Sequence, residues 1–457
     1  MKNILLLSLA FFTVFVTNAQ INTALPLTMG RGGAATTFNR NFDAIGINPS
    51  NLGWSDNKLL SVGILGFGWN VQSNSLAIAD LKTLFLNRGD AISAEQKETF
   101  SALFVDPQGL NYNFNAQWLG ASVKIPKIGA LAISLNSRTT THIGLNEVVS
   151  DIIFNGRDAA VFQDSATYSK NVGELLDGTN ITYTSLREFN VAYGLKLASI
   201  LNDKLEIFGG IGFKYIWGMG NLTIKSEDGI FVGRSSFSNN AKDINYNGIL
   251  NFDPQEAENL FNAPGQGYGF DIGGSIKLGG AFRAGISIVD IGSIEWTTNV
   301  LVAKDTTIQQ PADNGSEDFS WKEQAEYIYS KDGVLKMEEG KSYSTKLPTR
   351  IRIGAGIKAS EMFQIGVDFI APINNDEPAF DKASLILGLQ VNLVGLLKVS
   401  SGVNLNQQYG TSIPIGVTLG LFGKLEAGFA FGDLLTIING TDNPNASAAI
   451  GMLRINL

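Results

Sequence analysis

The chain has 457 residues, with 44% hydrophobic and only 17% charged residues, below the about 25% typical of soluble domains. Its formal net charge of −8 argues against a nucleic-acid partner and against a polybasic membrane-surface protein. The absence of cysteine excludes a disulfide framework and a thiolate metal site. After Leu59 no linker rich in proline, glycine or serine divides the chain, so we expect one continuous domain from 58 to 457.

Residues 1–19 have the pattern of a secretory signal peptide. Lys2 supplies the positive start, and Ile4–Val16 is the apolar stretch. Small residues in Thr17–Ala19 precede an expected cut before Gln20. The apolar stretch is shorter than the roughly 20 residues that span a bilayer, which disfavours a membrane anchor. The sequence therefore predicts export.

The segment from 20 to 57 does not alternate like a strand. Two glycine-rich and Asn-Pro stretches, Met29–Ala35 and Asn41–Gly53, indicate tight backbone turns. A segment of this length before the first strand either fills the lumen of a wide barrel as a hatch or remains a disordered periplasmic tail. We favour the hatch, and its candidate residues are Gly30, Arg31, Gly32, Gly33, Asp43, Asn48 and Pro49.

From Leu60 onward the chain alternates apolar and polar residues in runs of about ten, which is typical of a transmembrane β-barrel. The clearest run is Leu110–Trp118, where four amide side chains alternate with apolar ones. The runs amount to about fourteen strands, an even number as single-chain barrels require. They are Leu60–Val71, Leu110–Trp118, Leu131–Arg138, Glu188–Leu197, Glu206–Trp217, Tyr268–Leu278, Phe282–Ile288, Arg350–Lys358, Phe363–Phe369, Ser384–Asn392, Leu397–Asn404, Ile413–Leu419, Leu425–Phe431 and Ala446–Leu457. We therefore predict an all-β, 14-stranded antiparallel transmembrane barrel with an N-terminal lumenal hatch.

The apolar face of each strand must contact lipid, because a wet lumen solvates charged side chains and hydrocarbon does not. The predicted lumen-facing polar residues are Asn113, Arg138, Glu188, Lys196, Glu206, Lys214, Asp271, Lys277, Arg283, Arg350, Arg352 and Asp368. Aromatic residues near strand ends fit the interfacial girdles of such barrels, namely Tyr112, Trp118, Tyr215, Trp217, Tyr268 and Trp296. The high glycine content, 51 residues, suits strands that pack closely. Asp290 has the parity of a lipid-facing residue, so we place it above the membrane or past a bulge.

Short and long connections alternate along the chain. The short ones are Pro126–Gly129, Ser199–Lys204, Gly279–Gly280, Ala359–Met362, Val394–Gly395 and Phe422–Lys424. Most of the others are long, including Ser73–Gly109, Thr141–Arg187, Ser226–Gln266 and Thr297–Pro348. This predicts periplasmic turns and termini, with acidic outer loops. Ser93 and Gln96 form a capping-box pattern, which predicts a short helix in the first long loop.

The glycine-rich start, Asp43-Ala44 and the Asn48-Pro49-Ser50 sequence resemble the N-terminal hatch of long-chain fatty-acid outer-membrane transporters and of PorV-type proteins of the Bacteroidota. The family pattern has Asn-Pro-Ala, so Ser50 is a mild departure. Ser287–Trp296 also looks like a motif of a related, uncharacterised Bacteroidota barrel family, and Gly267–Gly273 and Leu347–Thr349 are further recurring pieces. The resemblance implies a fourteen-stranded barrel with a lumenal N-terminus. It also implies either a hydrophobic ligand or partnership with a type IX secretion translocon.

Little in the sequence indicates catalysis, and we expect no enzyme and no cofactor. The single histidine, His142, ends a strand and is expected at the surface. Gly209, Gly210 and Gly212 resemble a nucleotide loop but lie inside a strand. Asp243, Asn245 and Asn247 match the first half of a Ca²⁺ loop, but Pro254 occupies the position of the essential glutamate, so a polar turn is the favoured interpretation.

Two functions remain open. The first is an outer-membrane barrel that binds or passes a hydrophobic small molecule beside its hatch. The second is a closed barrel that acts as an interaction or plug partner of a type IX secretion translocon. In both cases we expect outer-membrane lipid as a partner. The alternating end, Leu453–Leu457, is of the kind that the barrel-assembly machinery recognises, although the usual terminal Phe is Leu457.

Overall fold

A computed structural model describes residues 24–73, 75–77, 79–80, 92–105, 109–202, 204–238, 263–311, 334–374, 382–393, 396–406, 410–421, 425–434, 436 and 445–457. The expected signal peptide and the calcium-like loop lie outside these residues. Within the described part of the chain, no helix has the length and apolar character needed to cross a membrane.

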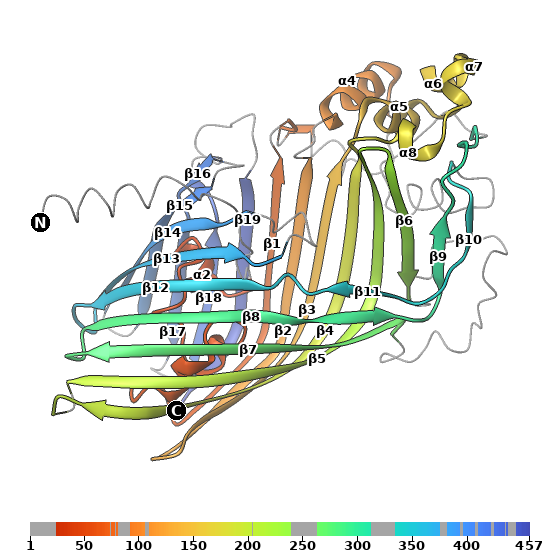
Figure 1. Ribbon diagram of the computed structural model, residues 1–457. Coiled ribbons are helices and arrows are strands. Elements are labelled where there is room, and N and C mark those ends of the chain that lie inside the picture. The colour runs from red at the N-terminus through yellow and green to blue at the C-terminus, as the bar shows by residue number, and fades with distance from the viewer. Residues whose placement is uncertain are drawn as a thin grey trace, which may run out of the picture.

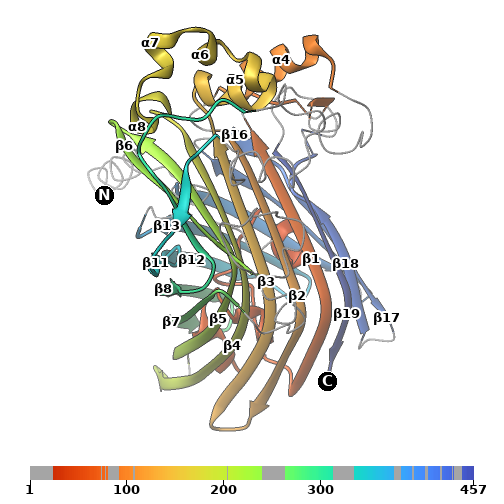
Figure 2. The same ribbon diagram turned by 90° about the vertical axis from the view of Figure 1, so that its right-hand side faces the viewer.

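Fourteen antiparallel strands close into a barrel, which confirms the predicted fold class (Figures 1 and 2). Each strand pairs with its neighbour along the chain, and the first strand pairs with the last through a register that includes Ser61 with Asn456. The strands are β1 (Leu60–Ser73), β2 (Leu110–Ile125), β3 (Gly129–Gly144), β4 (Asn180–Ile200), β5 (Leu205–Glu227), β7 (Gly265–Leu278), β8 (Phe282–Trp296), β12 (Arg350–Lys358), β13 (Phe363–Pro372), β14 (Ser384–Leu393), β15 (Leu397–Asn406), β17 (Ile415–Leu421), β18 (Leu425–Phe431) and β19 (Asn445–Asn456). All fourteen predicted runs coincide with these strands.

The alternation of side chains produces two faces. On β3, Leu131 and Leu135 face outward and are 39% and 36% exposed, whereas Ser134 between them is buried inside the barrel. Every backbone donor and acceptor in such a closed sheet pairs with a neighbouring strand, so the outside can be apolar without exposing unpaired polar groups. The same two-residue period gives the other strands an apolar outer face.

A β-bulge in β8 reverses the expected parity near Asp290. The β7–β8 register shifts between Phe270 and Ile272, and Asp290 has a positive φ of 59°. Two residues of β8 therefore oppose one residue of β7, which turns Asp290 into the lumen. The prediction that Asp290 lies past a bulge is confirmed.

The prediction for Trp296 is wrong for the same reason. Its side chain is fully buried, stacks on Tyr343 with ring centroids 6.4 Å apart, and donates from Nε1 to Thr345. The shift in parity at the bulge removes Trp296 from the outer girdle. Trp118 and Tyr268, by contrast, are 43% and 53% exposed on the outside.

The two ends of the barrel differ. One end, here called the short-turn end, carries tight connections such as those at 126–128 and 279–280. The other, the long-loop end, carries the short strands β6 (Ile230–Phe237), β9 (Val300–Ala303), β10 (Met337–Glu339), β11 (Tyr343–Lys346) and β16 (Gly410–Ser412). Strands β4 and β5 extend beyond the predicted runs and shorten the loops that the sequence suggested.

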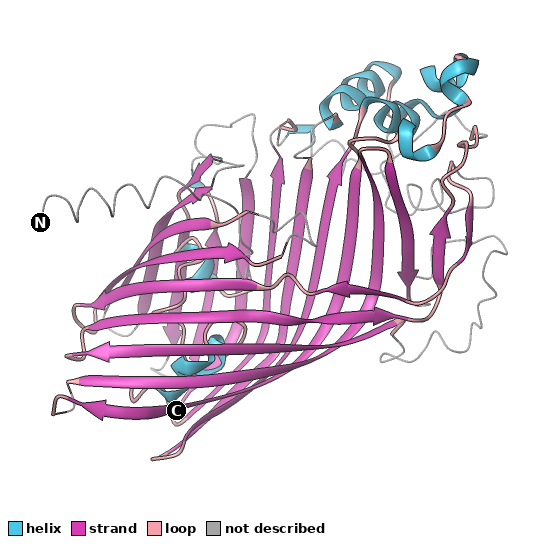
Figure 3. Ribbon diagram, in the orientation of Figure 1, coloured by secondary structure: helices cyan, strands magenta, loops and turns pink. Residues whose placement is uncertain are grey.

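Small helices cover part of the long-loop end (Figure 3). They are α4 (Ala94–Phe104), α5 (Glu147–Asn155), η3 (Gly156–Asp158), α6 (Ala160–Gln163), α7 (Ser165–Tyr168) and α8 (Val172–Leu175). The capping box predicted at the start of α4 is present, because Ser93 and Gln96 exchange side-chain to backbone hydrogen bonds.

These helices and the ends of the strands enclose an apolar core, here called the cap cluster. Among the residues that the structure describes, it holds 22 buried hydrophobic ones, including Phe100, Phe104 and Phe154. The ring of Phe154 lies 5.6 Å from that of Phe104 and 6.1 Å from that of Phe100. Leu222 and Ile224 of β5 contribute from the barrel wall, so the cap and the wall share one core.

Residues 24–57, here called the lumenal segment, pack inside the barrel. The segment contains the helix α2 (Pro26–Gly30) and the 3₁₀ helices η1 (Asn41–Ala44) and η2 (Pro49–Gly53). Helix η2 contacts β3, β4, β5 and β7, whereas α2 contacts β15, β17, β18 and β19 on the other side. Phe42, Leu52 and Trp54 are at most 1% exposed. The segment therefore bridges opposite parts of the wall.

A ring of small residues on the inner wall accommodates the lumenal segment, and we call it the glycine ring. In twelve strands a glycine faces the segment so closely that a Cβ would crowd or overlap it, and Ala132 of β3 and Ala430 of β18 complete the ring. The glycines are Gly63, Gly66, Gly120, Gly194, Gly210, Gly273, Gly285, Gly354, Gly356, Gly366, Gly388, Gly402, Gly416 and Gly451. Close strand packing was the reason the sequence suggested for the high glycine content. In this ring the reason is instead that only glycine lets the wall approach the segment.

Candidate functional site: the lumenal segment and its polar cavities

The Asn48-Pro49-Ser50 turn anchors η2 to the wall. Asn48 is the N-cap residue of η2, and its side-chain oxygen accepts a hydrogen bond from the backbone N–H of Ser50 at 3.1 Å. Its amide nitrogen donates to the carbonyl of Gly274 at 3.2 Å. The Ser50 hydroxyl donates to Ser275 at 2.8 Å. One short turn thus binds both to itself and to β7.

Asp368 of β13 holds the glycine-rich part of the lumenal segment. Its carboxylate accepts hydrogen bonds from the backbone N–H of Ala35 and of Thr36, at 2.9 and 2.8 Å. Arg352 lies 3.6 Å from the same carboxylate and donates to the carbonyl of Gly33. Gly32 and Gly33 have φ values of 70° and 99°, which non-glycine residues rarely adopt.

Two further carboxylates bind the segment to the short-turn end. Asp43 of η1 forms a two-pronged pair with Arg454 of β19, at 2.5 and 2.7 Å. Asp56 pairs with Arg40 at 3.1 Å and with Arg283 at 2.8 Å, and it also contacts Lys277. These pairs connect the middle of the lumenal segment and its C-terminal end to different parts of the wall.

The charge environment of Asp56 has a clear effect on its titration. Burial alone raises the pKa, but the opposing charges of Arg283, Lys277 and Arg40 outweigh it and hold the pKa of Asp56 well below the usual 3.8. The carboxylate is therefore ionised at neutral pH and remains available to all three cations.

A central ion cluster lies in the lumen beyond the segment. The Asp290 carboxylate contacts Lys214 and Arg350 and lies 3.1 Å from Arg138. Lys214 also pairs with Asp271 at 3.0 Å, and Arg138 with Glu188 at 3.0 Å. A polar cavity of about 70 Å³ adjoins this cluster. Removing either partner of such a buried pair destabilises the protein strongly, since the remaining charge would be uncompensated.

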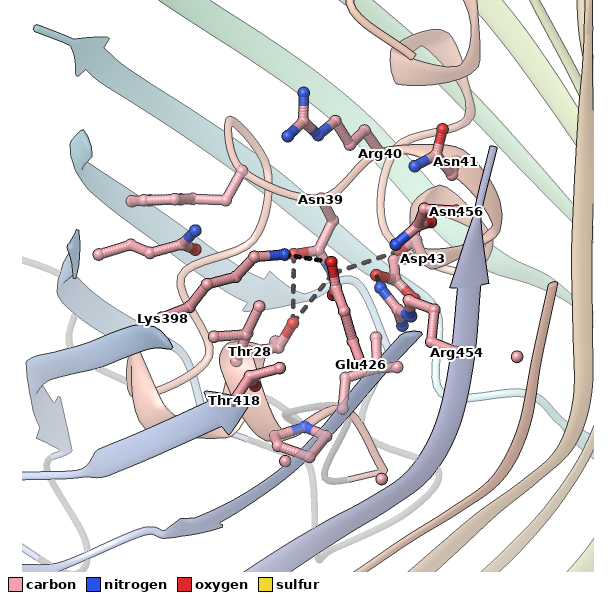
Figure 4. A pocket seen from close by; sticks show the side chains of 18 of the residues that line it. Thr28, Asn39, Arg40, Asn41, Asp43, Lys398, Thr418, Glu426, Arg454 and Asn456 are labelled. Atoms are coloured by element: carbon pink, nitrogen blue, oxygen red, sulfur yellow. Dashed lines mark hydrogen bonds and ion pairs between the residues drawn. The ribbon is translucent and has the colours of Figure 1, made fainter. Parts of the chain in front are cut away.

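A larger cavity of about 150 Å³ opens between the lumenal segment and the wall at the short-turn end, and we call it the short-turn cavity. In Figure 4, Lys398 and Glu426 point toward one another, with Thr28 and Asn39 of the segment close by. Lys398 donates to Glu426 at 2.6 Å. Asp43 and Arg454 line the opposite side (Figure 4).

The structure places the predicted lumen-facing residues as follows. Ten of the twelve are buried on the inner face, and the remaining two, Lys196 and Glu206, pair at 3.2 Å near the short-turn rim. The ten buried residues belong to the central ion cluster, to the contacts of Asp56 or to the pair of Arg352 with Asp368, except for Asn113, which belongs to none of these groups. His142, which the sequence placed at the surface, is only 4% exposed and lies 2.8 Å from the Asn111 side chain through its Nδ1. The expectation for His142 is wrong because it faces inward near the cap cluster.

Sequence reasoning missed Asp56, Lys398, Glu426 and Arg454 as contributors to these sites. Lys398 and its partner Glu426 lie on β15 and β18, for which the sequence prediction assigned no lumen-facing residues. The two-residue period of the strands could have identified Glu426 and Arg454. Glu426 has the same parity as the lumen-facing Gly428 of its strand. Arg454 has the parity of the lumen-facing Gly451 once the bulge between them is taken into account.

The chemistry of these residues favours holding the segment and binding polar groups. No cluster of three or more His, Asp or Glu side chains suited to a metal ion occurs among the residues described. Asp43 and Asp56 pair with cations across the interface between the segment and the wall, and the central ion cluster pairs charges within the wall. Their arrangement fixes the lumenal segment and leaves two polar cavities beside it.

Comparison with known proteins yields one family and several structures. Residues 55–425 match the model of a family of unknown function, DUF5723. The curated proteins give no match. Among solved structures, the TodX deltaS2S3 mutant monoaromatic hydrocarbon channel has a TM-score of 0.50 at 10% identity, covering 96% of this chain and 99% of that chain.

Two other structures are similar at lower scores. The P. putida toluene transporter TodX has a TM-score of 0.42 at 9% identity, covering 96% of this chain and 99% of that chain. A Pseudomonas aeruginosa FadL homologue also has a TM-score of 0.42, at 10% identity, and covers 96% of each chain. At these identities the likeness to the hydrocarbon channel concerns the fold. Because its family model matches most of the chain, this protein belongs to the DUF5723 family.

Proposed function

We propose that this protein is an outer-membrane β-barrel that binds or passes a small hydrophobic molecule, with residues 24–57 acting as a hatch. The observation that carries the proposal is a closed fourteen-stranded barrel whose lumen is occupied by its own N-terminal segment. The full-length likeness in fold to a monoaromatic hydrocarbon channel supports the same class of cargo.

The outer face of the barrel supports a membrane location. Large hydrophobic side chains are exposed on strand after strand, including Ile211 at 62%, Phe270 at 53% and Leu419 at 53%. A soluble protein rarely exposes so extensive an apolar surface, whereas lipid stabilises it. With a signal peptide expected at 1–19, the outer membrane is the location that fits a closed barrel.

The lumen offers different environments along its length. The cap cluster at the long-loop end is apolar, whereas the cavities beside the lumenal segment are polar. A hydrophobic molecule arriving from the long-loop end would first meet apolar side chains and would leave them before it reached the charged hatch. We therefore place the binding region at the inner side of the cap cluster, near Leu222 and Ile224.

Reconstituted liposomes test the proposal. The full chain is expected to increase the permeation of toluene but not of sucrose, and to conduct few ions in planar bilayers. Deletion of residues 20–57 is expected to raise the ion conductance, because the segment that fills the lumen is gone. A variant with Leu222→Asp is expected to lose toluene permeation while ion conductance stays low, since a charge in an apolar passage is costly.

Equal toluene permeation with and without the protein would refute the cargo class. Unchanged conductance after the deletion would refute the hatch. A soluble location on cell fractionation would refute the membrane assignment itself.

A second candidate function is a closed barrel that acts as an interaction partner. The buried charge network, in which Arg352 pairs with Asp368 and Asp290 with three cations, favours it, because such packing suits a lumen that stays shut. Partnership with a type IX secretion translocon remains a prediction of the sequence resemblance. A stable complex on gentle extraction, together with no toluene permeation, would favour this candidate.

A further inference from the structure

The short-turn cavity has an unusual balance of charge for this chain. Of the described residues, seven basic and three acidic side chains line it, although the whole chain has a net charge of −8. When the neighbouring pair of Asp56 and Lys277 is included, the cations still outnumber the carboxylates by four. The basic residues are Arg31, Arg40, Lys58, Arg283, Lys358, Lys398 and Arg454.

Most of these cations already have a carboxylate. Arg454 pairs with Asp43, and Lys398 with Glu426. Arg40 and Arg283 share Asp56. Lys358 pairs with Glu361. Of the seven lining cations, Arg31 and Lys58 are therefore the two without an ion pair among the residues that the structure describes.

Arg31 is the critical residue. Its side chain belongs to the lumenal segment and is only 3% exposed, yet no carboxylate of the described residues lies within ion-pair distance of it. Its guanidinium donates only to neutral oxygens, those of Gln390 at 2.6 Å, Asn39 at 2.7 Å, Thr28 at 3.3 Å and the Ala34 carbonyl at 2.9 Å.

A buried guanidinium without a counter-charge is costly. Burial lowers the pKa of Arg31 to about 9, although the more distant Asp43 and Asp368 act in the opposite direction. Buried charges in proteins are normally paired or bound to an ion, because the transfer from water is otherwise unfavourable. An anion in the adjoining cavity would supply the missing charge.

Lys58 provides a second cation at the mouth. It follows the lumenal segment, is exposed, and has no ion pair among the residues that the structure describes. The buried Arg31 would offer an anion a hydrogen-bond donor that is shielded from water, and the exposed Lys58 would attract the anion to the opening of the cavity.

We propose that the short-turn cavity binds a small oxyanion, a phosphate or carboxylate group, between Arg31 and Lys58. Four neutral oxygens already accept from the Arg31 guanidinium, which has five N–H groups, so a remaining Nη1–H and the Lys58 ammonium would each donate one charge-assisted hydrogen bond to the oxyanion. The volume of about 150 Å³ holds such a group with a few waters but not an extended hydrocarbon chain. The site is distinct from the apolar region near Leu222 and does not depend on the proposed function.

Binding to the purified full chain in detergent tests the proposal, by calorimetric titration at constant ionic strength. Inorganic phosphate and acetate are the free anions, dihexanoyl phosphatidic acid presents the same chemistry as a lipid headgroup, and glycerol is the neutral control. We expect saturable phosphate binding that also raises the unfolding temperature, because a ligand specific to the folded state stabilises it. Displacement of phosphate by the short-chain lipid would identify a headgroup as the source, and displacement by acetate alone would identify a free anion.

The variants separate binding from folding. Arg31→Gln is expected to weaken phosphate binding about tenfold or more, because a charge-assisted hydrogen bond is lost, whereas Arg31→Lys keeps the charge and retains part of the binding. Lys58→Gln, at an exposed position that does not affect folding, is expected to weaken binding a few-fold. Lys127→Gln, at the exposed turn after β2, is the matched control and should bind as the unmodified chain does.

Two results would overturn the proposal. One is the absence of saturable binding for phosphate, acetate and the lipid phosphate alike. The other is unchanged phosphate binding in both Arg31→Gln and Lys58→Gln, with the heat-modifiable mobility of a folded barrel retained.

Discussion

The two halves of the lumen are filled in different ways. At the long-loop end, helices and strand ends pack an apolar core around Phe154, without buried ion pairs among its members. Toward the short-turn end, the lumenal segment lies against the glycine ring and is held by carboxylates such as Asp43, Asp56 and Asp368. Apolar contacts are non-directional, whereas hydrogen-bonded ion pairs and backbone contacts fix one position.

This difference indicates which half can adapt. A core of aromatic and aliphatic side chains can repack around a hydrophobic guest at moderate cost. In the other half, any shift of the lumenal segment would break a buried charge pair or a backbone contact, and this loss costs more free energy than repacking an apolar core. We therefore assign adaptation to the cap cluster and rigidity to the seat of the lumenal segment.

The largest expected effect comes from a substitution in the glycine ring. Gly210→Leu places a side chain where the backbone of Pro49 lies, so the lumenal segment cannot dock as it does now. We expect the segment to become sensitive to protease and the barrel to lose its heat-modifiable mobility or most of its yield. The matched control is Gly274→Leu on the neighbouring strand, which faces outward and has no atom closer than 3.9 Å to its added Cβ.

Equal protease resistance in these two variants would show that the close approach of wall and segment does not hold the segment in place. A defect in both would point to a general intolerance of the strands.

The next effect is that of Asp290→Asn in the central ion cluster. The change leaves Arg138, Lys214 and Arg350 buried around a neutral group, and we expect a loss of about 3–5 kcal/mol in unfolding free energy. Denaturant unfolding of the refolded barrel measures it. Glu361→Gln breaks an exposed pair with Lys358 and should cost no more than about 1 kcal/mol.

Phe154→Ala tests whether the cap cluster is independent of the other half. The deletion of a fully buried aromatic side chain is expected to cost about 3–5 kcal/mol, confined to the cap helices. Hydrogen exchange should speed up in α4 and α5, while residues 24–57 keep their protection. Faster exchange in the lumenal segment as well would mean that the two halves form one cooperative unit.

The smallest effect is that of Asp56→Asn, and it depends on pH. Because the pKa of Asp56 is lowered in the folded protein, its carboxylate contributes stability that is fully present above the ordinary value of 3.8 and is lost as the pH falls below it. At neutral pH we expect a cost of about 1–3 kcal/mol, measured as protease sensitivity of the segment. The difference from the unmodified chain should shrink in strong acid, and a constant difference down to the lowest pH would contradict the role of its charge.

Much of the barrel was predictable from the sequence. The alternation in Leu110–Trp118 and thirteen similar runs identified every strand of the barrel, because the period of two is a local property of extended chains. The capping box at Ser93 was also local and is present. Trp296 and His142 were misplaced, since a bulge near Asp290 and the inward fold of the cap depend on contacts with distant strands.

The candidate sites were predictable only in part. Parity indicated that Arg352 and Asp368 face inward, but not that Asp368 would hold the backbone of Ala35 and Thr36. The wall partners of Asp56, Lys277 and Arg283, come from positions more than 200 residues away. Such pairings follow from strand register and from the position of the lumenal segment, neither of which a local pattern determines.

The amino-acid sequence by itself determined the number of strands, their two faces and the presence of a separate glycine-rich segment before them, because each follows from local periodicity and backbone preference. Only the tertiary structure decided why the inner wall is rich in glycine, since that depends on how closely the segment at 24–57 approaches twelve different strands. It also decided that Arg31 lies buried without a carboxylate beside a polar cavity. A charge acquires its cost and its partners only when the surrounding chain excludes water from it.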